Sequence, residues 1–409
     1  MNSVTPLSSS RVAVRGRMPR LSPAAAFYLQ ASITVSFLAG SSAPTPLYPL
    51  YQAQWDLSPV TVTEIFGIYA LAVLAALLVA GRLSDHVGRR PVLLAATLAQ
   101  AVTMAIFATV DGVGGLMVAR VLQGLSTGAA VAAVGAGVMD LDKARGTTAN
   151  AIAPLTGTAL GAVLAGLFVQ FLPAPTHLVY GVLGIVFVLQ ATGLFLMDET
   201  IAPRAGALAS LKPRFDLPPA VRDPLLRAIP ALVATWALAG LYGSLAPTLV
   251  RHLLGSKASL LGGLALFVLA ASGGVAVLLL HRHPPRRMMS VGAAALFTGV
   301  AIVVAALSYR SPIAFFAGTA IAGMGFGAGF QGAVRTVVPL AAPHERAGVL
   351  AVIFVVSYVA MGAPAVFAGS LLAHGGNVFA TAREFGAVVM VLAALALAGS
   401  LTSGARRRA

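Results

Sequence analysis

The stretch AGRLSDHVGRRPVLL, residues 80–94, interrupts a chain that is otherwise strongly apolar on both sides. Four formal charges fall within nine of its residues, on Arg82, Asp85, Arg89 and Arg90. Gly81 and Gly88 flank these charges, and glycine lets a backbone turn sharply between helix ends. The pattern indicates a short polar loop between two long apolar segments.

Composition places those apolar segments in a bilayer. Hydrophobic residues make up 58% of the 409 residues and charged residues 10%, whereas a soluble domain carries about 25% charged residues. The mean hydropathy is +0.90. One or two soluble cores cannot hide this much apolar surface. The absence of cysteine excludes disulfides and thiolate metal sites.

Twelve apolar runs approach or exceed the roughly 20 residues that a membrane-spanning helix needs. They lie at 24–47, 60–80, 91–110, 113–138, 149–171, 177–197, 228–250, 258–280, 289–308, 312–334, 347–373 and 384–402. None shows the alternation of period two that marks a strand. The first run is too long for a cleaved signal peptide. We predict an all-α membrane protein with twelve transmembrane helices.

The basic residues predict the orientation of these spans. With a cytoplasmic N-terminus, 22 of the 27 Lys and Arg residues fall in inner segments and four in outer loops. Arg120 alone lies inside a span. We therefore predict a multi-pass protein of the cytoplasmic membrane with both termini cytoplasmic. The net charge of +15 is explained by this topology and by attraction of the inner surface to anionic lipid. The basic residues are scattered over seven short segments, and this distribution excludes a nucleic-acid site.

The chain divides into two similar halves. GRR at 88–90 recurs as PRR at 285–287, and KARGTTANA at 143–151 is echoed by HERAGVLAV at 344–352. Such a repeat indicates a duplicated six-span unit, and hence two pseudo-symmetric bundles. The predicted parts are a cytoplasmic tail 1–23, a bundle 24–197, a proline-rich linker 198–227, a bundle 228–402 and a tail 403–409.

The opening stretch resembles the loop signature between the second and third spans of the major facilitator superfamily. That signature is Gly-x-Leu-x-Asp-x-x-Gly-Arg-Arg/Lys, and it matches at Gly81, Leu83, Asp85, Gly88, Arg89 and Arg90. ARVLQGLSTGAA at 119–130 resembles the fourth-span motif of the family. APLTGTALG at 153–161 is similar to the fifth-span motif of its drug/proton antiporter branch, but Ala153 and Thr158 replace two of its glycines.

The resemblance implies roles for these motifs. Asp140 would pair with Arg89, and Asp85 would meet the start of the eleventh span. The expected conformational latch comprises Gly81, Asp85, Gly88, Arg89, Arg90 and Asp140. The alternative is that the loop charges only hold the loop in the cytoplasm. The fifth-span residues Pro154, Gly157 and Gly161 are expected to serve antiport, close helix packing, or both.

Two charged residues are candidates for proton coupling. A charge inside a span is expensive enough to imply a role or a partner, and Arg120 is such a charge. The resemblance links the arginine at this position to proton movement. Glu64, near the start of the second span, lies at a similar depth and is expected to face Arg120. The alternatives are that Glu64 lies among lipid headgroups and that Arg120 bonds backbone carbonyls for structure alone.

A central cavity is expected between the halves, lined mainly by spans 1, 4, 7 and 10. The candidate lining residues are Ser36, Tyr48, Tyr51, Gln123, Trp236, Tyr242, Phe326, Phe330 and Gln331. Aromatic and amide groups suit an amphipathic organic solute, and they equally suit ordinary packing. The first span has no carboxylate to attract a cation.

Enzyme functions find no support in the sequence. The seven histidines are scattered, and none pairs with another at metal-ligand spacing beside an acid, so we expect no metal and no cofactor. The glycine run at 323–332 lies inside a span and indicates packing rather than nucleotide binding.

The predicted function is a secondary transporter, a proton-coupled exporter of a small organic solute. Its expected partners are that solute, protons and membrane lipid, and we expect a monomer. The alternatives are an importer, a uniporter, or a membrane sensor or scaffold that transports nothing.

Overall fold

The computed structural model describes residues 20–213, 215, 217–255, 259–342 and 344–405. Residues 1–19 and 406–409, which belong to the two predicted tails, lie outside this part. The described residues contain twelve helices long and apolar enough to cross a membrane, and their regular structure is entirely helical. The predicted fold class is therefore confirmed.

The first half contains six spans. Its elements are α1 (Pro23–Ser42), a 3-10 turn (Thr45–Leu47), α2 (Tyr48–Trp55), α3 (Pro59–Ala80), α4 (Ser84–Val87), α5 (Arg89–Thr109), α6 (Val113–Leu141), α7 (Lys143–Phe171) and α8 (Pro175–Phe195). Serine caps start two of the helices, since the side chains of Ser22 and Ser58 accept bonds from Ala25 N and Thr61 N.

The second half repeats the arrangement after the short linker helix α9 (Ala207–Ser210). Its elements are α10 (Pro219–Ser244), α11 (Ala246–Leu254), α12 (Ser259–Leu280), α13 (Pro285–Ser308), α14 (Pro312–Val337), α15 (Arg346–Ala373) and α16 (Val378–Ala405). Helix α10 begins inside the predicted linker 198–227. Proline is tolerated in a first helical turn, so Pro219 starts this helix rather than prolonging a loop.

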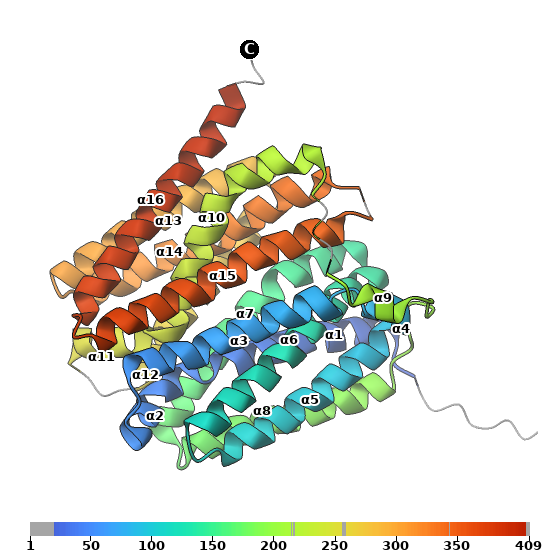
Figure 1. Cartoon of the computed structure of the whole chain (residues 1–409), viewed down its shortest axis with the longest axis horizontal. Helices are drawn as coiled ribbons and strands as arrows, with labels where there is room; N and C mark the ends of the chain where they lie inside the picture. The colour runs from blue at the N-terminus through green and yellow to red at the C-terminus, as the bar shows by residue number, and fades with distance from the viewer. Residues whose placement is uncertain (1–19, 214, 216, 256–258, 343, 406–409) are drawn as a thin grey trace, which may run out of the picture.

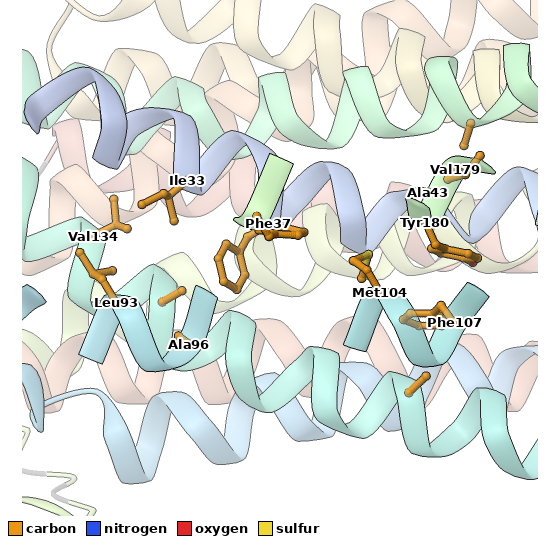
Figure 2. Close-up of a cluster of buried hydrophobic side chains, with 14 of the residues drawn as sticks. Ile33, Phe37, Ala43, Leu93, Ala96, Met104, Phe107, Val134, Val179 and Tyr180 are labelled. Carbon is orange, nitrogen blue, oxygen red and sulfur yellow. The ribbon is translucent and has the colours of Figure 1, made fainter. Parts of the chain in front are cut away.

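The two halves lie side by side, with α4 and α9 at one end of the molecule and α2 and α11 at the other (Figure 1). We call these the linker end and the far end. Two helix pairs, α3 with α15 and α7 with α12, make the main contacts between the bundles. The first bundle is held by a core in which Phe37, Met104, Phe107 and Tyr180 meet between α1, α5 and α8 (Figure 2).

Glycines allow the helices of the first bundle to approach closely. Gly157 and Gly161 on α7 face α1, where an added Cβ would overlap the carbonyl oxygens of Val35 and Ala39. Pro154 lies in the same helix, one turn earlier. Within the second bundle, the glycines of the run at 323–332 bring α14 against α12 and α13 in a similar way. Close backbone contact of this kind stabilises helix pairs in lipid.

This packing makes a matched pair of glycine substitutions informative. We expect Gly161→Ala to lower the free energy of unfolding by about 1–3 kcal/mol, because the methyl group meets backbone that cannot move aside. Gly181→Ala in α8 is the control, since its Cβ would meet nothing within 4 Å. Thermal unfolding in detergent measures both, and equal midpoints for the two variants would contradict the close approach.

Candidate functional site

The guanidinium of Arg120 lies in the interior of the first bundle and is 0% exposed. Its Nη1 donates to the carbonyl oxygen of Ser41 at 3.0 Å and to Oε1 of Gln123 at 2.6 Å. Its Nη2 donates to the hydroxyl of Tyr48. The ring centroids of Tyr48 and Tyr69 lie 5.7 and 5.1 Å from its Cζ. One cation thus connects α6 with α1, α2 and α3.

The break in the first span explains these bonds. Proline has no N–H, so Pro44 cannot donate to the carbonyl of Gly40 four residues earlier. The side chain of Gln123 supplies the missing donor, with its Nε2 2.9 Å from the Gly40 oxygen. Arg120 serves the next carbonyl, that of Ser41. The two polar residues of α6 thereby satisfy the backbone where α1 ends.

The structure does not bring Glu64 to Arg120, so the expected pairing is corrected. Glu64 is exposed on α3, whereas the side chain that α3 places over the guanidinium is Tyr69. Five residues separate the two positions, which turns them about 140° apart around a helix. Among the described residues no carboxylate is buried, and Arg120 forms no ion pair.

Five of the expected cavity residues instead lie inside their own bundles. Tyr48 and Tyr51 are 1% exposed, and Gln123 is fully buried beside Arg120. Ser36 accepts a bond from Gln190 Nε2 at 2.8 Å, and the Tyr242 hydroxyl lies 2.6 Å from that of Thr319. Each of these polar groups forms a hydrogen bond with a neighbouring helix of its own bundle, and such bonds stabilise polar groups that are buried.

Aromatic side chains gather instead where the two bundles meet. The ring of Trp236 on α10 lies 4.9 Å from that of Tyr358 on α15 and 5.4 Å from that of Phe330 on α14. Tyr69 of α3 packs in the same buried cluster as Tyr358. We call Tyr69, Trp236, Phe330 and Tyr358 the seam cluster. Phe326 and Gln331, also on α14, are half-buried.

Sequence reasoning named Trp236 and Phe330 but missed Tyr69 and Tyr358. Both tyrosines belong to the second and eleventh spans, which were not expected to line the cavity. No feature of the sequence distinguishes them from other aromatic residues in apolar runs. The pairing of α3 with α15 places them.

At the linker end, the predicted latch residues form a compact group. Arg89 is 7% exposed, and its Nε donates to Asp140 Oδ2 at 3.1 Å. Its Nη1 donates to Ser84 Oγ at 2.7 Å and to Asp85. These bonds all lie within the first bundle, and the contact of Asp85 with the start of the eleventh span stays a prediction.

Glu199 completes this group and was not among the predicted site residues. Its carboxylate accepts bonds from the backbone N–H groups of Arg89 at 2.8 Å and Arg90 at 3.1 Å, and so caps the start of α5. The Arg90 side chain donates in return to the last carbonyls of α8. Gly88 has φ +104°, and a Cβ there would meet the Glu199 carboxylate, so glycine is needed.

The far ends of the bundles are in direct contact. Thr45, in the turn after α1, donates through Oγ1 to the carbonyl oxygen of Gly243 on α10 at 2.9 Å. Thr63 of α3 packs directly against Gly369 of α15. Within the described residues, no group of three or more histidine or acidic side chains is placed to hold a metal ion.

The family model of the Major Facilitator Superfamily matches residues 31–365. The chain belongs to the Major Facilitator Superfamily. The match runs through both bundles and includes the latch residues, Arg120 and the seam cluster. It makes the protein a multi-pass membrane transporter rather than an enzyme, and implies that its substrate is a small molecule.

Solved transporter structures share this superfamily fold. A bacterial homologue of the human lysosomal transporter Spinster, inward-facing and unoccupied, is 13% identical and has a TM-score of 0.73; the match covers 95% of this chain and 98% of that one. The human organic anion transporter TETRAN is 19% identical with a TM-score of 0.66, over 92% and 100%. The nucleoside transporter NupG is 10% identical with a TM-score of 0.68, over 93% and 99%.

The contact between Arg120 and Tyr48 can be tested by removing one hydroxyl. We expect Tyr48→Phe to lower the free energy of unfolding by about 1–3 kcal/mol, because it leaves a buried cation with one fewer acceptor. Tyr28→Phe is the control, since Tyr28 is 65% exposed. Chemical unfolding in detergent gives both values. An unchanged midpoint for Tyr48→Phe would show that the Tyr48 hydroxyl does not stabilise the buried Arg120.

Proposed function

We propose that this transporter exports a small organic solute across the cytoplasmic membrane by alternating access, in exchange for protons. In this proposal the linker end faces the cytoplasm, because most of the basic residues lie at that end. The transporter acts as a monomer within membrane lipid. The observation that carries the proposal is the buried Arg120 beside the seam between two bundles.

Alternating access is supported by the way the bundles meet. Their contacts are concentrated in two helix pairs, and the far-end contact between Thr45 and Gly243 is a single hydrogen bond. One such bond contributes only about 0.5–1.5 kcal/mol. The rest of the far-end contact is packing, such as that of Thr63 against Gly369, which has to separate when this end opens. Rocking of two bundles about a central site is how transporters of this architecture work.

Proton coupling in this proposal depends on Arg120. It is the only basic residue within a predicted span, and the resemblance links it to proton movement. Among the described residues no buried carboxylate is available to carry the proton instead. That observation favours a second candidate function, uniport of the same solute.

Transport into inverted membrane vesicles separates the two functions. We expect a pH gradient, acidic inside, to raise uptake of a transported compound several-fold, since export driven by protons becomes uptake in this orientation. A panel of antibiotics, sugars and organic acids supplies the compound. Glu64→Gln is expected to keep both the uptake and its pH profile, because Glu64 is exposed. Uptake at the same rate with and without the pH gradient would favour uniport.

The latch is tested separately. We expect Asp85→Asn to reduce transport several-fold without reducing insertion, because the charge that Arg89 meets on one side is lost. Asp111→Asn, at an exposed turn between α5 and α6, is the matched control. Flux is normalised to the amount of protein in the membrane. Equal flux in the two variants would show that the loop charges only fix topology.

A further inference from the structure

Two buried hydrogen-bond donors beside the seam have no partner among the described residues. They are Nε of Arg120 and Nε1 of Trp236. Both groups can only donate, so each requires an acceptor. Buried polar groups are normally paired, and leaving a donor unpaired in a low-dielectric interior is unfavourable. Both groups therefore require a hydrogen-bond acceptor from outside the described residues.

These donors belong to opposite bundles at a similar depth. Arg120 lies about two turns into α6 from the far end, and Trp236 about two turns before α10 reaches the same end. Tyr69 connects them, because its ring lies over the guanidinium and packs in the cluster that contains Tyr358. The ring of Tyr358 in turn contacts Trp236.

The charge of this region is positive and uncompensated. The bonds that Arg120 donates end on two neutral side chains and one carbonyl, and no described carboxylate is buried to balance it. A charge in such surroundings is felt more strongly than in water. A cationic solute between the bundles is therefore disfavoured, and an anionic one is favoured.

We propose that the transported solute is a small aromatic anion, such as a carboxylate attached to a ring. Its negative group accepts from Trp236 Nε1, with the Arg120 guanidinium behind the ring of Tyr69 as the fixed positive charge. Its ring packs against Trp236, Phe330 and Tyr358. This inference rests on the proposed transport function and names the substrate class of the same site.

Binding to the purified wild-type protein tests the substrate class without a transport assay. The probes are benzoate, 1-naphthoate and indole-3-acetate, each with its matched amide and amine. We expect at least one carboxylate to raise the unfolding midpoint and to bind tenfold more tightly than its amine. The proposal is overturned if amides or amines bind as well as the carboxylates, or if no carboxylate binds at millimolar concentration.

Two variants then test the assigned donors. Trp236→Phe keeps a ring but removes the N–H, and Arg120→Gln removes the charge. We expect both to weaken carboxylate binding several-fold. Arg120→Gln is expected to leave binding of the amide unchanged, whereas Trp236→Phe weakens the amide as well, because an amide oxygen also accepts from an N–H. Arg120→Lys is expected to restore part of the selectivity. Arg383→Gln removes an exposed arginine near the start of α16 and is the control. If Arg120→Gln does not fold, Trp236→Phe and the wild-type series decide the question.

Flux distinguishes this inference from the function on which it rests. Proteoliposomes that bind carboxylates selectively but move no compound faster than empty liposomes would refute transport and keep the anion site. Proteoliposomes that move amines or neutral compounds in preference to carboxylates would keep transport and refute the anion site.

Discussion

The fold depends on one constraint, which is that a broken helix inside a membrane must have its backbone satisfied. Pro44 interrupts the first span, which runs from Pro23 to Trp55, and water is not available in the membrane interior to bond the freed carbonyls. Arg120 and Gln123 on α6 supply the donors. Their presence in turn requires Tyr48 and Tyr69 to cover the charge. The polarity of α6 and the positions of Tyr48 and Tyr69 beside it are therefore connected with the same requirement.

The first bundle holds a buried arginine at two places, the interior site and the linker end, and the surroundings of the two arginines differ. At the interior site a cation is held by neutral groups, and among the described residues no buried acid balances its charge. At the linker end Arg89 meets two carboxylates, and Glu199 covers the N-terminus of α5. Charge there is compensated locally, so the arrangement fixes helix ends instead of attracting a ligand. Arginine thus has opposite roles at positions 89 and 120, and the difference lies in whether acids are near.

The lengths of the apolar runs predicted the twelve spans, and the distribution of basic residues predicted their orientation. Both properties depend only on the order of residues along the chain. The polar loop at 80–94 was visible in the residue pattern, and the closeness of Arg89 to Asp140 was implied by the family resemblance. The rotation of each helix about its axis could not be predicted in the same way. Glu64 and Tyr69 both lie in the second span, and only the packing of α3 against α6 and α15 decides which one meets Arg120. Glu199 was missed because its bonds join residues 110 positions apart in the chain.

The bonds that close the linker end have a consequence for how the chain is made. The ion pair of Arg20 with Asp198, the cap that Glu199 places on α5, and the contact of Arg89 with Asp140 join the first, third, fourth and sixth spans. All of these residues leave the ribosome before α10 begins. Because domains generally fold in the order of their synthesis, the first bundle can be complete before the second enters the membrane. The second bundle then packs against α3 and α7 of a bundle that has already folded. The first bundle thus acts as a template for the assembly of the second bundle.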